Sequence, residues 1–217
     1  PGQKKAVEYL KKFYQSNGIK SPLGGNDYFQ DVPSEYLSNN RRGMTLKDSE
    51  NVVAFIEGSE KPEEILVISA HLDHEGVKNG EIYNGADDDG SGTVAILEIA
   101  EAFQKAVKAG KRPKRSILFL HVTGEEKGLL GSKYYTENPI FPLANTVTNL
   151  NIDMVGRIDP KRTEGDRNYI YLIGADKLST ELHNVSEAVN KKYTNVELDY
   201  KYNDENDPNR FYYRSDH

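Results

Sequence analysis

Apolar positions along this chain recur with two different periods, which predict alternating helices and strands. Near the amino-terminal end, Ala6, Tyr9, Leu10 and Phe13 fall on one face of a helix. Similar spacing predicts helices over residues 3–16, 91–108, 127–136 and 178–193. Short, β-branched runs predict strands over residues 51–57, 65–70, 116–122, 146–153, 169–173 and 196–202. The segments 17–40 and 203–210 are polar and contain turn-forming residues, so we expect loops there.

Strands that alternate with helices are typical of an α/β domain, with a mostly parallel central sheet flanked by helices. The chain has 217 residues, which suits one large domain better than two small ones. We therefore expect residues 1–217 to form a single domain. No apolar run approaches the length of a bilayer crossing, so the sequence predicts no membrane span.

Composition excludes several kinds of chemistry. The formal net charge is −6, which disfavours a broad nucleic-acid-binding surface. The sequence contains no cysteine, so it has no disulfide, no thiolate metal site and no catalytic thiol.

Acidic and histidine residues gather where predicted strands end. They are, in chain order, His71, Asp73, Glu125, Glu126 and Asp153. The Gly-rich loop 84–92 joins the first of these strands to its helix and carries three consecutive aspartates. Ligand sites in open α/β sheets form beyond the carboxyl ends of the strands. We therefore expect all of these side chains at one edge of the sheet.

Each of these features alone also has a purely structural explanation. A lone His71 would more often be a hydrogen-bonded structural residue, and Glu125 with Glu126 would suit the first turn of a helix. His121 lies inside a predicted strand, where a core or supporting role explains it better. Together, several carboxylate and imidazole groups at one edge would repel each other without a cation. Oxygen and nitrogen ligands without thiolate suit a hydrolytic zinc site.

Five ordered blocks of the sequence carry a family resemblance. They are ISAHLDHEG (68–76), YNGADDDGSGTVAILEIA (83–100), LHVTGEEKGLLGSKYY (120–135), NLNIDMVGR (149–157) and YRSDH (213–217). This set resembles the co-catalytic zinc aminopeptidase family. That family also includes glutamate carboxypeptidases, catalytically silent transferrin receptors and, more distantly, glutaminyl cyclases. The resemblance covers nearly the whole chain and implies a phosphorylase/hydrolase-like zinc exopeptidase architecture.

The resemblance implies a site with two zinc ions. His71 and Asp153 would bind one ion, and Glu126 and His217 would bind the other. Asp87 would bridge both ions, and the peptide bond after it can be cis. With this set, three carboxylates and two Zn²⁺ ions leave one positive charge, which a bound hydroxide cancels.

The resemblance also implies roles around the metals. Glu125 would be the general base, and Asp73 would orient the His71 ring, as metal-bound imidazoles usually require. At a turn between strand and helix, Glu125 and Glu126 can diverge. Which of the two binds metal comes from the resemblance, because spacing alone does not decide it.

These roles imply hydrolysis of peptide bonds, with a metal-bridging hydroxide and Glu125 removing amino acids from the N-termini of peptides or proteins. A glutaminyl cyclase-like enzyme, a carboxypeptidase and a non-catalytic, receptor-like relative are the alternatives. The cyclases typically work with one zinc, and the receptor-like relatives lose ligands or the base. The complete set here therefore favours an active peptidase.

The resemblance further implies a secreted or periplasmic protein. Relatives begin before the first helix and continue beyond His217, so we expect the chain to be incomplete at both ends. The sequence leaves open which side chain is preferred at the cleaved residue, because variable loops build that pocket.

Overall fold

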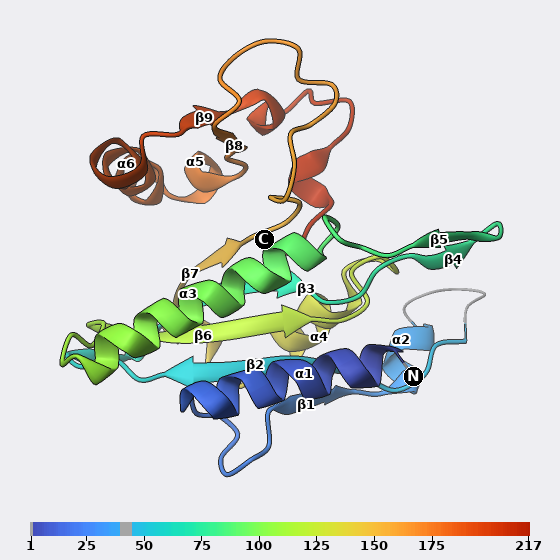
Figure 1. The fold of residues 1–217 in the computed structure, drawn as a ribbon, viewed down its shortest axis with the longest axis vertical. Helices are drawn as coiled ribbons and strands as arrows, with labels where there is room; N and C mark the ends of the chain where they lie inside the picture. Colours follow the sequence, from blue (N-terminus) through green and yellow to red (C-terminus); the bar gives the residue numbers. More distant parts are fainter. Residues whose placement is uncertain (1, 40–44) are drawn as a thin grey trace. The chain divides into compact units, whose positions relative to one another are not determined.

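The computed structural model describes residues 2–39 and 45–217, and it divides into two compact units (Figure 1). The first unit comprises Pro1–Gly156 with Asp216–His217, and the second comprises Arg157–Ser215. Each unit has a sheet of its own. The prediction that residues 1–217 form one domain stays a prediction.

A five-stranded sheet forms the centre of the first unit. Its strands, in spatial order, are β1 (Phe29–Val32), β2 (Ser49–Ile56), β6 (Arg115–Val122), β3 (Lys61–His71) and β7 (Thr146–Asn151). β3 pairs in parallel with both β6 and β7, whereas β2 runs antiparallel to β6 and to β1. Within this sheet only β2 runs against the others. The predicted α/β fold with a mostly parallel sheet is therefore confirmed.

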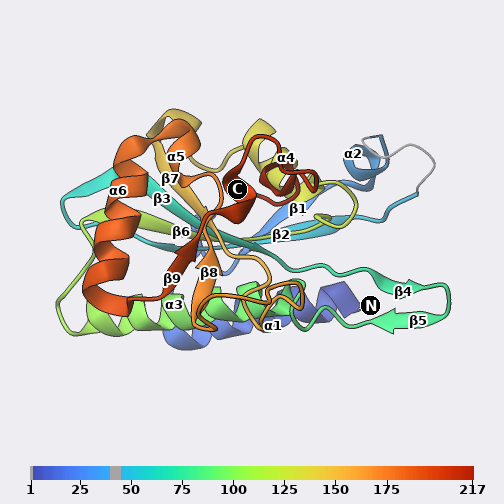
Figure 2. The same ribbon diagram turned by 90° about the horizontal axis from the view of Figure 1, so that it is seen from above.

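Alternate residues of the central strands face opposite sides of the sheet, as the pleat of a strand requires. Val52 and Ala54 of β2 belong to one core cluster with residues of α1 (Gly2–Asn17) and α3 (Gly90–Lys108). These two helices lie side by side on one face of the sheet (Figures 1 and 2). Val53 points the other way and packs in a second cluster with Tyr135 of α4 (Leu130–Glu137). The sheet is thus buried on both faces, which explains its nearly continuous apolar strands.

His121 of β6 is a core residue. It is fully buried, and its Nε2 lies 2.7 Å from the Tyr14 hydroxyl on α1. Burial lowers the pKa of His121 to about 3, so the ring is neutral at neutral pH. The interpretation of His121 as a core residue is confirmed.

Several local predictions were wrong at their edges. The segment 17–40 contains β1 and α2 (Ser34–Asn39), apart from residue 40, which lies outside the described residues. A hairpin of β4 (Gly76–Lys78) and β5 (Glu81–Tyr83) was not predicted. The helix expected over 127–136 begins at Leu130, because Gly128 and Leu129 have left-handed φ angles of 111° and 58°.

The second unit is built around a parallel pair of strands, β8 (Tyr169–Tyr171) and β9 (Glu197–Asp199). Its helices are α5 (Ala175–Leu178) and α6 (Thr180–Val189), and α6 continues as a π-helical turn over Asn190–Thr194. The helix expected over 178–193 is interrupted at Ser179, whose side chain caps α6.

Short 3₁₀ turns complete both units, at Leu143–Asn145, Lys201–Asn203 and Phe211–Tyr213. The described segments include no helix long and apolar enough to cross a bilayer.

Candidate metal centre

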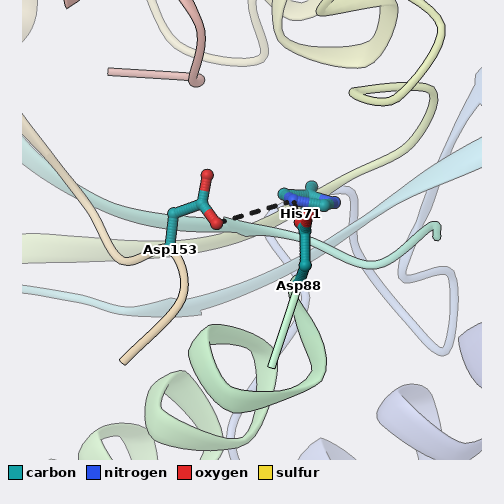
Figure 3. Close-up of side chains that lie close together, drawn as sticks. All are labelled: His71, Asp88 and Asp153. Carbon is teal, nitrogen blue, oxygen red and sulfur yellow. Dashed lines mark ion pairs between the residues drawn. The ribbon is translucent and has the colours of Figure 1, made fainter. Parts of the chain in front are cut away.

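Side chains from neighbouring strands meet at the carboxyl edge of the sheet in the first unit. His71 ends β3, and it lies opposite Val122, which ends β6. His71, Asp88 and Asp153 offer ligand atoms that all lie within 4.8 Å of one another (Figure 3). Asp153 follows β7, which pairs with the other side of β3. The register of the parallel strands is thus what brings His71 and Asp153 together.

The His71 ring is held so that one nitrogen faces acidic groups. The side chain is 1% exposed, and its Nδ1 donates to the backbone carbonyl of Asp73 at 2.9 Å. Its Nε2 is buried and makes no hydrogen bond with the residues that the structure describes. Three carboxylate oxygens surround Nε2, from Asp88 at 3.1 Å, Asp153 at 3.8 Å and Glu125 at 3.9 Å. A cation would satisfy both this nitrogen and the carboxylates.

Asp73 supports the site through two different groups. The resemblance implies that its side chain orients His71, but its backbone carbonyl makes that hydrogen bond. The Asp73 carboxylate accepts instead from the backbone N–H groups of Glu125 at 3.0 Å and Glu126 at 3.3 Å. Asp73 therefore ties the end of β3 to the loop that follows β6.

The aspartate beside His71 is Asp88, whereas the resemblance implied Asp87. The Asp87 carboxylate accepts from the backbone N–H of Gly156 at 2.7 Å and from the Ser91 hydroxyl at 3.2 Å. Both aspartates lie in the turn that precedes α3, and the Asp88 carboxylate is the one that approaches His71 Nε2, at 3.1 Å. Among the described residues, Asp87 lies outside the candidate group. The cis peptide bond is likewise one residue later than expected, between Asp88 and Asp89.

Asp89 is a supporting residue that the sequence interpretation did not assign. It is 1% exposed, and its carboxylate accepts from three backbone N–H groups. They belong to Gly92 at 2.9 Å, His71 at 3.2 Å and Met154 at 3.2 Å. Asp89 therefore caps α3 while holding the backbone at both strand ends of the centre. A structural interpretation of Asp87–Asp89 as turn and N-cap residues fits Asp89, because it lies just before the helix.

Glu125 and Glu126 diverge, as expected for a turn. The Glu125 side chain is largely buried and approaches His71, whereas Glu126 is half-buried and lies outside the group of His71, Asp88 and Asp153. The assignment of Glu125 as base and Glu126 as ligand stays a prediction.

The YRSDH block contributes a buried acid next to the expected ligand. His217 is exposed, and it lies outside the candidate group in the part of the chain that the structure describes. Asp216 is buried, and its carboxylate accepts from the Ser132 hydroxyl. Its backbone carbonyl accepts from the Asn149 amide at 3.0 Å. The sequence interpretation missed Asp216, whose only signal was its place beside His217.

The electrostatics of the centre favour positive charge. Burial is the largest cause of raised pKa values at Asp73, Asp89, Glu125, Glu126 and Asp216, with values of about 8 for Asp89 and Glu125 and about 6 for Asp216. Burial would lower the pKa of His71, but the neighbouring carboxylates of Asp153 and Asp88 outweigh it and raise the pKa to about 12. The buried carboxylates of this cluster attract protons because of their negative charge, and they would attract a divalent cation for the same reason. One imidazole with carboxylates suits zinc, so His71, Asp88 and Asp153 fit such an ion.

An α/β fold with a histidine–carboxylate centre beyond its parallel strands has the layout of a metal-dependent hydrolase. The model of peptidase family M28 matches residues 51–217. The chain belongs to peptidase family M28.

Individual relatives and a solved structure are similar over parts of the chain. The aminopeptidase NAALADL1 of Rattus norvegicus is 35% identical over 113 residues, which are 51% of this chain and 14% of that protein. The probable glutamate carboxypeptidase AMP1 of Arabidopsis thaliana is 37% identical over 111 residues, 51% of this chain and 15% of that protein. A zinc aminopeptidase from Bacillus subtilis has a TM-score of 0.53 at 28% identity, over 67% of this chain and 33% of that one. The chain thus spans about one seventh of the two relatives' length.

Proposed function

We propose that this chain carries the catalytic centre of a zinc-dependent exopeptidase that removes N-terminal residues from peptides. The observation that carries the proposal is the buried Nε2 of His71, which faces the carboxylates of Asp88 and Asp153 and has no hydrogen bond within residues 2–39 and 45–217. The similarity to two proteins named aminopeptidases, one of them a zinc enzyme, supports the same reaction class.

In this proposal each residue at the edge of the sheet has a separate task. His71, Asp88 and Asp153 hold a zinc ion. Asp88 thus has the metal-binding role that the resemblance implied for Asp87. Asp89 and Asp73 hold the backbone segments that carry these ligands. The site is therefore supported by buried carboxylates that do not themselves bind metal.

Glu125 is the residue proposed to move protons. A bound zinc supplies Lewis-acid polarisation of the scissile carbonyl and lowers the pKa of a nearby water. Glu125 accepts a proton from the attacking water and passes it to the leaving amine. Burial raises the pKa of Glu125 to about 8, and the positive charge of His71 acts in the opposite direction. A bound cation would therefore favour the ionised, basic form of Glu125.

Two further expectations go beyond the three grouped residues. A second zinc, held by Glu126 and His217, stays a prediction, and so does the secreted or periplasmic location. Inductively coupled plasma mass spectrometry of the zinc-loaded protein measures the number of zinc ions per chain and so tests the second zinc.

The reaction is tested with paired substrates on the full chain. The zinc-loaded protein should hydrolyse an amino-acid anilide with a free amine, and it should not hydrolyse the N-acetylated anilide. Glu125→Gln should keep its zinc and lose about 10²–10⁴-fold in turnover, the range of general acid–base catalysis. Glu98→Gln, an exposed position on α3, is the matched control and should keep full turnover. Unchanged turnover in zinc-loaded Glu125→Gln would remove Glu125 from the mechanism.

A carboxypeptidase is the second candidate, because the Arabidopsis relative is named a probable glutamate carboxypeptidase. A peptide with a free amine and an amidated carboxyl end separates the two activities. Release of the first residue from this peptide supports the aminopeptidase. Cleavage that occurs only when the carboxyl end is free would favour the carboxypeptidase.

A further inference from the structure

In the sequence, the β4–β5 hairpin lies between two residues of the metal centre, His71 and Asp88. It follows the His71–Asp73 segment, and the chain returns from it to Asp88. The hairpin extends away from the central sheet of the first unit in both views (Figures 1 and 2). Its turn is formed by Asn79 and Gly80, with φ angles of 54° and 82°. Two successive left-handed residues are typical of a tight hairpin turn that matches the strand twist.

The base of the hairpin is fixed beside the loop that follows β6. A Cβ on Gly85 would lie 2.5 Å from the His74 Cβ, so the two ends of the hairpin are in close contact. The backbone N–H of Gly90 donates to the Gly85 carbonyl at 2.8 Å. Glu75 lies 3.8 Å from the ammonium of Lys127, which directly follows Glu126. The hairpin is therefore positioned relative to the centre rather than attached by a loose loop.

One face of the hairpin is apolar and exposed. Val77 and Ile82 are a cross-strand pair, and each is 71% exposed. Lys78 and Glu81 form the next pair, and they point to the opposite face because side chains alternate along a strand. In the described part of the chain, β4 and β5 form a sheet with no third strand. Both outer edges therefore offer backbone groups to an extended chain.

We propose that the β4–β5 hairpin is a docking surface for the peptide substrate, contacting the residues that follow the cleaved bond. This inference rests on the proposed exopeptidase function. The occupant is an extended peptide, because the base of the hairpin is joined to the segments that carry His71 and Asp88, and its strands combine open edges with apolar side chains. A strand of three residues spans about 10 Å, which suits about three substrate residues. Substrates with apolar side chains at the second to fourth positions are preferred.

A second copy of the chain is a weaker occupant for this surface. Stable association between proteins buries about 1,200 Å² or more. Val77 and Ile82 are two aliphatic side chains on a narrow hairpin, which supply only a small part of that area. A peptide needs far less area because the metal centre also holds it.

The test compares a short and a long substrate in the full, zinc-loaded chain. Val77→Ser with Ile82→Ser should lower kcat/KM for a hexapeptide with apolar second to fourth residues by roughly tenfold, mainly through KM. It should leave kcat/KM for the amino-acid anilide unchanged within about twofold, because the anilide does not reach the hairpin. The exchange Val77→Ile with Ile82→Val keeps the apolar face and should retain hexapeptide turnover. Val147→Ser, at an exposed valine of β7, is the control and should change neither substrate.

The outcomes separate the inference from the function on which it rests. No anilide turnover in the unmodified protein would overturn the proposed function, and the hairpin's role with it. Normal anilide turnover with an unchanged hexapeptide rate in the serine variant would overturn the hairpin's role alone. Analytical ultracentrifugation adds a further outcome. A dimer that the serine variant dissociates, with equal loss on both substrates, would assign the surface to a second copy and refute the peptide assignment.

Discussion

Replacing Asp89 by Asn tests whether a buried carboxylate organises the metal centre without binding metal. Asp89 accepts backbone N–H groups from Gly92, His71 and Met154, which belong to three separate segments. The substitution keeps the size and shape of the side chain. It replaces one carboxylate oxygen by an NH₂ group, so it changes the hydrogen bonds more than the packing.

The expected magnitude follows from which oxygen serves which donor. Oδ1 accepts from Gly92 and Met154, and Oδ2 accepts from His71 at 3.2 Å. The single oxygen of Asn can keep the first two bonds, but its NH₂ group then faces the N–H of His71. The loss is the hydrogen bond from the His71 N–H plus one unpaired buried donor, and it is offset in part because the repulsion between the Asp89 and Asp153 carboxylates disappears. We expect the metal-free protein to lose about 2–4 kcal/mol of unfolding free energy.

Urea unfolding in EDTA, followed by zinc titration, measures both consequences. Asp89→Asn should unfold at lower urea and bind zinc about 10–100-fold more weakly, because the backbones beside two ligands are no longer held. Asp88→Asn is the matched control, since its side chain is 46% exposed. It should shift metal-free stability by less than about 1 kcal/mol and still lose zinc. Equal stability changes in the two variants, or a change below about 0.5 kcal/mol for Asp89→Asn, would refute the reasoning.

Three further predictions concern neighbouring features. Asp88→Asn should weaken zinc binding by at least about a hundredfold and Asp87→Asn by less than tenfold; equal losses by isothermal titration would return Asp87 to the ligand set. Burial lowers the pKa of His121 from 6.5 to about 3, so the stability it contributes is complete above about pH 6.5 and falls towards pH 3. The loss is up to about 1.4 kcal/mol of unfolding free energy per pH unit. Urea unfolding in EDTA between pH 7 and 5 should show that the unfolding free energy of His121→Gln changes less with pH than that of the unmodified protein. The same change with pH in both proteins would contradict this cause. Gly92→Ala would place a Cβ 2.2 Å from the Ile152 carbonyl, so unfolding free energy should fall by about 3 kcal/mol, and an unchanged urea midpoint would count against this contact.

Part of the centre was predictable because strand ends can be located in a sequence. His71 and Asp153 follow short apolar runs, and parallel strands bring such ends to one edge. Asp88 was not predictable in the same way, since it is one of three consecutive aspartates with similar local chemistry. Its neighbours are engaged by Gly156 and by the N-terminus of α3, and Asp88 is the one that faces His71.

The hydrophobic pattern by itself determined the central strands, the helices α1 and α3, and the α/β class of this chain. An element that is buried on one or both faces needs apolar residues at a regular spacing, and this spacing can be seen in the sequence. Only the tertiary structure decided which carboxylates converge, how Asp73 holds His71, and where the β4–β5 hairpin stands relative to the centre. These features depend on contacts between segments far apart in the chain. A side chain's direction at such a contact is set by the partner it meets, and local spacing contains no information about that partner.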